Sequence, residues 1–283
     1  MRLYKYLHPD RTDVLSRQRI RFTPPLALND PFELKPNITA LASSSDIDDQ
    51  LLELTPKIFD EELAKLPPEI RNRIPRHILN ALMAEQMPRI REQVKSAANA
   101  LSPRIRDKME KTFERMLGVL CLSERIDSLL MWAHYADSHR GFLIEFDPLA
   151  EFFDRRRSPQ DELRHLRKVR YSNKRPSSTL FELEDYSSFM TKGLEWEYEA
   201  EWRITQTFES ADQVIGSGLD PIHLFCFAPE TVKSVVFGCK MSETKRLEIS
   251  QILKETPGYS EVSVQRAEVD QTEYRLNFLR ADA

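Results

Sequence analysis

Glycine is scarce in this chain, which has 7 glycines in 283 residues against 17 prolines. Loops that cradle phosphate groups need clustered glycines, because only then can backbone N–H groups approach the anion. Neither GxGxxG nor GxxxxGK followed by Ser or Thr occurs. The sequence therefore argues against Walker-type NTPases and against Rossmann enzymes that bind dinucleotides.

Cysteines and long apolar runs are also scarce. The 3 cysteines (Cys121, Cys226 and Cys239) lie far apart among apolar neighbours, which is typical of reduced, buried thiols in a reducing compartment. No CxxC or HxxxH pair offers ligands, so no metal is predicted. No run approaches the roughly 18 apolar residues of a membrane span, and the start does not resemble a signal peptide. We expect a cytoplasmic protein with no membrane partner.

What is present suits a globular protein, with 41% hydrophobic and 30% charged residues. Apolar periodicity predicts an irregular mixture of strands and helices, and the lack of a strict βα repeat favours an α+β fold with mixed or antiparallel sheets and flanking helices. The predicted strands are Leu3–Leu7, Arg19–Phe22, Gly118–Ser123, Gly141–Asp147, Arg167–Tyr171, Leu224–Phe227, Val235–Phe237, Val262–Glu268 and Tyr274–Leu279. The predicted helices are Asp10–Arg17, Ser128–Asp137 (capped by Asp127), Pro148–Arg156, Ser178–Lys192 and Glu243–Lys254.

A helical insert is predicted at about 43–117, within a single domain that spans 1–283. Three serines from Ser43 can cap its first helix, and two longer helices are expected near Ile70–Ala98 and Pro103–Leu117. Its first part is acidic and its later part is basic. The basic part could contact nucleic acid, but a solvated helical face is the favoured interpretation. The overall charge of −4 gives no general footprint for a polyanion.

The densest polar segment is 195–204. If 199–205 forms a strand, its period of two puts Glu199, Glu201 and Arg203 on one face. Two carboxylates beside a guanidinium could hold hydroxyl groups or stabilise a developing cation, and their repulsion could raise one pKa for acid-base catalysis. On pattern alone, an exposed sheet face with an ordinary cross-strand ion pair is the favoured interpretation.

A second segment, 128–141, offers aromatic and histidine side chains. We expect this helix to be apolar on both sides and therefore buried, with His134 at its edge in or beside the core. His134 is a candidate catalytic residue, although a hydrogen-bonded core histidine is the alternative. Trp132, Tyr135 and His139 are candidate ligand-binding residues.

A third segment, 29–33, combines turn residues with carboxylates. Asn29 and Asp30 can satisfy local backbone groups, which explains the pattern structurally, and a loop that also carries Glu33 could equally line a cleft. The first strand adds Tyr4 and Tyr6 on one face and Lys5 on the other. Ser123 lacks the Gly-x-Ser-x-Gly elbow, so no nucleophilic triad is evident and Ser123 is a candidate for ligand binding only.

Several motifs occur together and in a fixed order: Tyr4-Lys5-Tyr6, Phe22-Thr23-Pro24, Leu28-Asn29-Asp30-Pro31-Phe32-Glu33, Cys121-Leu122-Ser123, Leu130-Met131-Trp132-Ala133-His134-Tyr135-Ala136, His139-Arg140-Gly141-Phe142 and Trp196-Glu197-Tyr198-Glu199-Ala200-Glu201-Trp202-Arg203. This set resembles a widespread bacterial family of unknown function, numbered 2971 among such domains. The resemblance spans most of the chain outside the insert and implies no established reaction.

The order strand, helix, strand, loop and late glutamate is more distantly similar to ADP-ribosyltransferases, which bind NAD without a glycine-rich loop. That similarity implies a glutamate that hydrogen-bonds the nicotinamide ribose while the glycosidic bond breaks. Glu201 is the first candidate for this role and Glu199 the second. It also implies an aromatic partner for the nicotinamide, supplied by Tyr6, Phe22, Trp132 or Tyr135.

Two other functions stay open. A hydrolase or nuclease could gather a divalent metal with Asp30, Glu33, Glu199 and Glu201. A non-catalytic module could instead sense a ligand in its cleft and dock a partner through the insert. We expect a small-molecule ligand, and the sequence names no macromolecular acceptor.

Overall fold

In the computed structural model, the described residues are 1–73, 75–183, 186–218 and 221–281. The chain divides into two compact units. The first, called the sheet unit below, comprises 1–35, 112–175 and 186–283, and the second, called the helical unit, comprises 36–111 and 176–185. Within the described ranges, no helix is long and apolar enough to cross a membrane.

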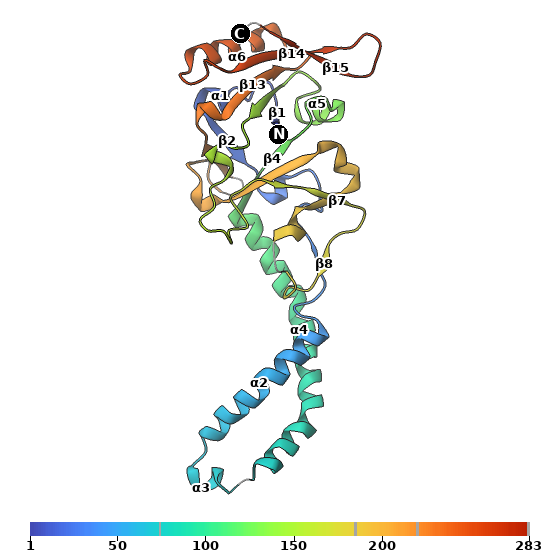
Figure 1. Cartoon of the computed structure of the whole chain (residues 1–283), viewed down its shortest axis with the longest axis vertical. Helices are drawn as coiled ribbons and strands as arrows, with labels where there is room; N and C mark the ends of the chain where they lie inside the picture. The colour runs from blue at the N-terminus through green and yellow to red at the C-terminus, as the bar shows by residue number, and fades with distance from the viewer. Residues whose placement is uncertain (74, 184–185, 219–220, 282–283) are drawn as a thin grey trace. The chain divides into compact units, whose positions relative to one another are not determined.

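An eight-stranded sheet forms the centre of the sheet unit (Figure 1), with the strand order β15-β14-β13-β5-β1-β4-β10-β6. Only β13 and β14 pair in parallel, and the other neighbours are antiparallel. The sheet is therefore mixed, and the predicted α+β class is confirmed. The strands are β1 (Leu3–Leu7), β4 (Leu117–Ser123), β5 (Phe142–Phe146), β6 (Arg167–Lys168), β10 (Glu201–Thr207), β13 (Val232–Phe237), β14 (Ser263–Val269) and β15 (Leu276–Arg280).

Smaller sheets and short helices complete the sheet unit. Its strands are β2 (Arg19–Phe22), β11 (Gln213–Ile215) and β12 (Ile222–Cys226) in one sheet, and β7 (Arg170–Ser172) and β9 (Thr191–Gly193) in another. Its α-helices are α1 (Asp13–Arg17), α5 (Leu129–Tyr135) and α6 (Glu243–Glu255). Its 3-10 helices are η1 (Pro25–Ala27), η2 (Glu151–Phe153), η3 (Tyr186–Met190), η4 (Leu194–Glu199), η5 (Phe208–Ser210) and η6 (Pro229–Thr231).

The side chains of β1 alternate between two apolar cores, as strand geometry requires. Leu3 and Leu7 belong to a large core that also holds residues of α1, α6 and the β2 sheet. Tyr4 and Tyr6 belong to a second core with Trp132 of α5. β1 therefore places its two tyrosines beside α5.

Two of the helices predicted after residue 147 are wrong. At Pro148–Arg156 only the single turn η2 forms, because the adjacent Phe152 and Phe153 are both buried and the following arginines offer no apolar period. In the predicted helix at 178–192, the described residues form the two-residue strand β8 (Ser177–Ser178), η3 and β9, and 184–185 lie outside the described residues. The predicted strand at 167–171 is divided between β6 and β7, which belong to different sheets.

The helical unit contains α2 (Ser44–Ala64), the short α3 (Pro68–Arg71) and most of α4 (Arg76–Met116), with α3 at the turn between the longer helices (Figure 1). β3 (Asn37–Ile38) and β8 pair beside them. Ser43 caps α2 as expected, since its hydroxyl accepts from the Asp46 N–H and the Asp46 carboxylate accepts from the Ser43 N–H. The predicted break before Pro103 is wrong, because α4 continues through Pro88 and Pro103.

Candidate functional site

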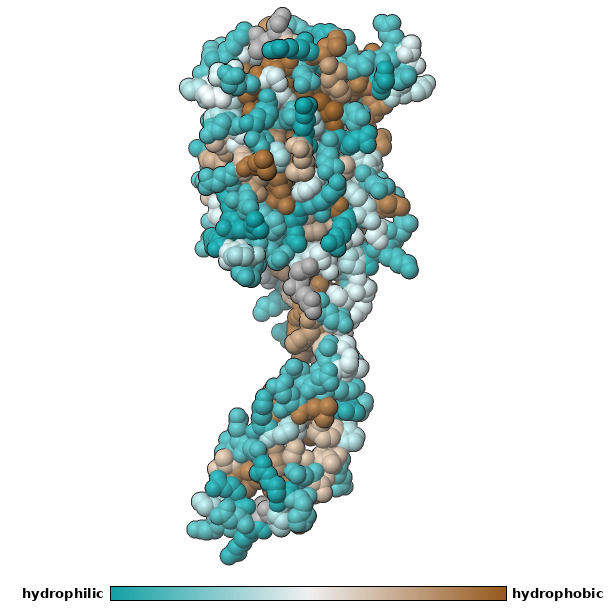
Figure 2. Space-filling view, viewed as in Figure 1, coloured by the Kyte–Doolittle hydropathy of each residue, from teal (hydrophilic) through white to brown (hydrophobic). Residues whose placement is uncertain are grey.

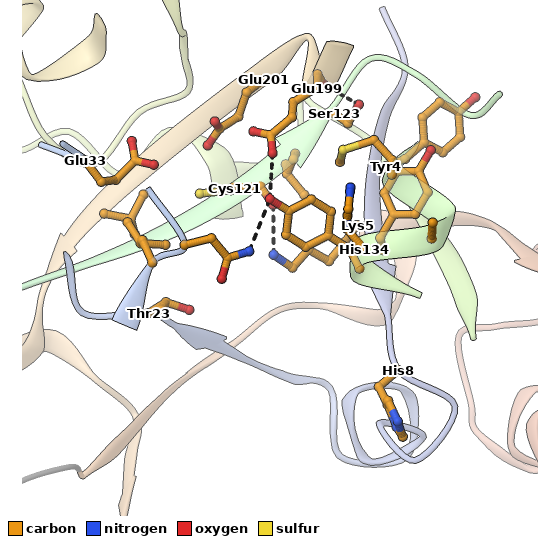
Figure 3. A pocket seen from close by; sticks show the side chains of 18 of the residues that line it. Tyr4, Lys5, His8, Thr23, Glu33, Cys121, Ser123, His134, Glu199 and Glu201 are labelled. Carbon is orange, nitrogen blue, oxygen red and sulfur yellow. Dashed lines mark hydrogen bonds between the residues drawn. The ribbon is translucent and has the colours of Figure 1, made fainter. Parts of the chain in front are cut away.

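A cavity of about 560 Å³ lies within the sheet unit. Its walls come from β1, β4, β9, α5, η4, the start of β10 and the loop that follows β2. The three polar segments identified in the sequence therefore meet around one cavity (Figure 3). The predicted site residues that line it are Tyr4, Lys5, Tyr6, Asn29, Glu33, Ser123, His134, Tyr135, Glu199 and Glu201.

A buried lysine connects the carboxylates of this cavity. Lys192 Nζ lies 2.6 Å from Glu199 Oε2, 3.2 Å from Glu201 Oε2 and 3.4 Å from Glu33 Oε2. All four side chains are at most 6% exposed. In Figure 3 the three glutamates lie on the same side of the cavity, and His8 lies apart from them. One buried ammonium group is thus shared among three buried carboxylates.

Arg203 supplies the second cation of this cluster. Its Nε and Nη2 donate to the two oxygens of Glu201 at 2.6 and 2.8 Å, and Nη2 also contacts Glu33 Oε1. Such a fork-to-fork pair fixes both side chains. Arg203 does not line the cavity but holds Glu201 at its wall. The predicted exposed ion pair is therefore not what the chain forms, because Glu201 and Arg203 are buried.

The two neighbouring glutamates of the cluster differ in proton affinity. Burial favours the neutral form of Glu201, but the Arg203 charge and hydrogen bonds together with Lys192 outweigh it and hold the pKa of Glu201 below its usual range. Burial raises the pKa of Glu199, with repulsion from Glu201 added, against the opposing effect of Lys192. Glu201 is thus a fixed anion, and Glu199 is the group that can exchange a proton.

Tyr135 and Asn29 extend the network from Glu199 toward the cavity mouth. The Tyr135 hydroxyl donates to Glu199 Oε1 at 2.6 Å, and Asn29 Nδ2 donates to the Tyr135 oxygen at 3.4 Å. Burial, followed by the hydrogen bond to Glu199, raises the pKa of Tyr135, so its hydroxyl stays a donor. Side chains of the segments 128–141 and 29–33 are therefore in contact with each other.

The backbone around Ala200 places Glu199 and Glu201 in the same wall. Glu199 ends η4, and the expected strand begins only at Glu201, so the predicted strand at 199–205 is wrong at its first two residues. Ala200 has a left-handed conformation (φ 42°, ψ 56°) between them. The Ser123 hydroxyl donates to the Glu199 carbonyl at 2.5 Å, and its residue pairs with Glu201 across β4 and β10. The turn, rather than strand alternation, brings the two carboxylates together.

Lys5 is a further basic side chain at the cavity. Its Nζ donates to the Cys121 carbonyl oxygen at 3.0 Å, and burial lowers its pKa, which favours the uncharged amine. Burial also raises the pKa of the Cys121 thiol, which is therefore neutral and a poor nucleophile.

His134 lines the cavity but is exposed, so its expected position in or beside the core is wrong. The reason is that α5 buries only one side: Met131 and Trp132 are buried, whereas Leu130 is 50% exposed. The helix cap is also corrected, because the Ser128 hydroxyl, and not Asp127, accepts from the Met131 N–H.

Four predicted ligand-binding residues, like Arg203, lie outside the cavity lining. Phe22 and Trp132 are fully buried in the two cores, where Trp132 packs edge-on against Tyr6. Asp30 is buried and its carboxylate accepts from the Phe32 N–H, as in an ordinary turn. His139 stacks on Trp132 and lines a different hollow, beside Cys239.

Lys192 is the main residue that the sequence interpretation missed. It was placed at the end of a predicted helix, whereas it lies in β9, between Thr191 and Gly193. The only local signal is a lysine two residues after the buried Phe189 and Met190. Among the residues that the structure describes, no three His, Cys, Asp or Glu side chains converge as a metal-binding group.

Most of the cluster (Lys192, Glu199, Glu201 and Arg203) lies in one stretch of sequence together with α5. Residues 131–204 match the family described as "Protein of unknown function (DUF2971)". This match supports the family that the ordered motifs resemble. No curated protein and no solved structure matches the chain. The comparisons thus add no support for the more distant ADP-ribosyltransferase similarity, which stays a prediction.

Proposed function

We propose that the cavity binds NAD and that the protein breaks the bond between nicotinamide and ribose, transferring ADP-ribose to an acceptor. The observation that carries this proposal is the composition of the buried ion cluster, in which three carboxylates share two cations. A surplus negative charge is costly in a buried site unless a cation or a proton compensates it. The nicotinamide ring of NAD carries a positive charge, and so does the sugar in the transition state.

The cavity also has the size and the aromatic walls that such a ligand requires. Its volume of about 560 Å³ falls within the roughly 300–1,000 Å³ of small-molecule sites. Tyr4, Tyr6 and Tyr135 line it together with Glu199 and Glu201. Flat aromatic rings can stack on nicotinamide and favour its positive charge.

The two glutamates would take different roles in this reaction. Nicotinamide leaves with the electron pair of the glycosidic bond and becomes neutral, so its departure requires no proton. Glu201, fixed as an anion by Arg203, would stabilise the cationic sugar. Glu199, whose pKa is raised, would accept the proton of the attacking hydroxyl as the acceptor oxygen bonds to the sugar. In other enzymes, too, two neighbouring carboxyl groups with different pKa values take separate roles, one as a fixed charge and the other in proton transfer.

The direct test is release of nicotinamide from NAD, measured by chromatography with water as the acceptor. Glu199→Gln should lower the rate by about 10²–10⁴-fold, the usual contribution of a positioned base. The matched control is Glu197→Gln, because Glu197 is an exposed carboxylate in the same short helix η4. It should leave the rate unchanged.

Three other outcomes would count against the enzyme. NAD binding without nicotinamide release would reduce the proposal to a ligand-sensing module. A response to Mg²⁺ or Mn²⁺ with none to NAD would favour the metal-dependent hydrolase. Equal loss of activity in Glu199→Gln and Glu197→Gln would remove Glu199 from the reaction.

A further inference from the structure

The long helices of the helical unit have no core of their own. α2 spans 21 residues, and none of them is buried. The only buried residue of α4 is Leu79. Helical stability in proteins comes mainly from packing an apolar face, and two helices that leave such faces open need a partner. Figure 2 shows apolar side chains at the surface of this unit among hydrophilic ones.

Four of the exposed apolar residues form two short rows, whereas Leu52, Val94 and Leu101 are exposed outside them. Leu54 and Ile58 lie one helical turn apart on α2, and Ile78 and Leu82 lie one turn apart on α4. Their exposed fractions are between 43% and 54%. Residues four apart occupy the same side of a helix. Each pair is therefore a stripe open to solvent.

Ion pairs place the two rows at the same level. Asp60 contacts Arg76 at 2.8 Å, and Asp48 contacts Arg91 at 2.9 Å, so α2 and α4 run antiparallel. In this register, Leu54 lies level with Leu82, and Ile58 with Ile78. When each helix is viewed from its N-terminus, its row lies to the same side of the residues that face the other helix. On antiparallel helices that offset puts both rows on one side of the pair.

The two helices carry opposite charge. α2 contains seven acidic residues and one lysine, whereas the part of α4 that runs beside it, 76–98, contains four arginines and lysines and two glutamates. One turn beyond Ile58, α2 carries Glu61 and Glu62, and beyond Leu82, α4 carries Glu85 and Gln86 at one turn and Arg89 at two turns. One side of this helix pair is thus apolar in the middle, and of its two helices one is acidic and the other is net basic along their shared length.

We propose that this side docks against the same side of a second copy of the chain. A two-fold axis parallel to the helices would place α2 of each copy over α4 of the other, so acid faces base and the four apolar rows meet. A two-fold axis across the helices would place α2 over α2, where like charges repel. The product is a four-helix bundle with an isologous interface. A nucleic acid fits less well, because the acidic α2 would repel it.

The first experiment measures the mass of the full chain in solution by sedimentation over a wide range of protein concentration. A dimer is expected. Leu54→Ser combined with Leu82→Ser should raise the dimer dissociation constant by about tenfold or more, since central apolar anchors dominate interfaces. The matched control is Leu149→Ser, because Leu149 is 91% exposed but belongs to the sheet unit. It should leave the dimer unchanged. A monomer at every concentration would overturn the proposal.

The second experiment tests the direction of the axis with a short bifunctional thiol cross-linker. Leu54→Cys and Leu82→Cys are made as separate variants, in a background where the three native cysteines are serines. A mixture of the two should give a cross-linked dimer, whereas neither variant alone should. Cross-linking of Leu54→Cys with itself would place α2 over α2 and contradict the arrangement. Equal cross-linking of Leu149→Cys would reveal random collision.

Discussion

Lys192 Nζ lies 2.6 Å from Glu199 Oε2, in a site where both side chains are almost completely buried. The same ammonium group also contacts Glu201 and Glu33. Lys192 is therefore the centre of the ion cluster, and its removal should leave all three carboxylates without this counter-charge.

Lys192→Met should lower the free energy of unfolding by about 3–5 kcal/mol, because breaking a buried pair leaves uncompensated buried charge. Urea denaturation of the purified chain measures this change. The matched control is Lys233→Met, since Lys233 pairs with Asp147 at 3.2 Å while it is 52% exposed. That change should cost less than about 1 kcal/mol. Equal effects of the two substitutions would show that the cluster is hydrated and weak.

Glu199 should make stability depend on pH in a defined direction. Its folded-state pKa is raised above the ordinary value of 4.5, mainly by burial. A group with a raised pKa binds its proton more tightly in the folded state, so its stabilising contribution is complete below pH 4.5 and is lost as the pH rises through the folded value. Glu199→Gln should therefore become progressively more stable than the unchanged chain as the pH rises from 4.5 to the folded pKa, and the difference should stay constant above it.

Urea denaturation at a series of pH values checks this prediction, with Glu197→Gln as the control. The exposed Glu197 should give a difference that does not vary with pH. If Glu199→Gln instead loses stability relative to the unchanged chain as the pH rises, the ion pair with Lys192 outweighs burial and the assignment of Glu199 as the proton-exchanging group fails.

Ala200→Gly should stabilise the chain. Ala200 has φ of 42°, and a left-handed conformation costs a residue with a Cβ about 1–2 kcal/mol, partly offset by the greater freedom of glycine in the unfolded chain. We expect a rise of up to about 1 kcal/mol in the free energy of unfolding. Ala211→Gly is the control, because Ala211 has φ of −67° and should lose stability. A loss at both positions would mean that the Ala200 turn carries no strain.

Ser43→Ala should weaken the start of α2. The substitution removes the side-chain half of a reciprocal capping interaction with Asp46, which typically costs about 1 kcal/mol. Hydrogen exchange of the first turn of α2 should become faster. Ser44→Ala, next to the cap and without a role in it, should leave exchange in that turn unchanged.

Strands with strong apolar patterns were the most predictable part of the fold. The sequence predicts β1 and β2 at their observed bounds and α6 to within one residue, because each has a clear period and flanking polar residues. The same reasoning wrongly predicts a helix at 178–192, because the apolar spacing there is that of a helix. In the structure, Phe189 and Lys192 are buried by other parts of the chain. Proline was also misleading at Pro103, where tertiary context lets α4 continue.

The sequence identifies most residues of the candidate site but does not show which of them contact one another. Alternation correctly linked Glu201 with Arg203, but it gave no indication that both are buried or that Glu199 reaches the cluster through the turn at Ala200. Lys192 could not be found from the sequence, because a single lysine has no motif and its role depends on three carboxylates from other segments. Local sequence patterns identify candidate residues, whereas the fold decides which of their side chains meet in space.

Calorimetric titration of NAD into the purified chain tests the central claim most directly. We predict saturable binding at one site per chain, weakened when Tyr135→Ala removes an aromatic wall and the donor to Glu199, and unchanged in Tyr274→Ala, whose fully exposed tyrosine lies away from the cavity. Absence of heat from NAD, in a sample shown to be folded by its unfolding transition, would contradict the account.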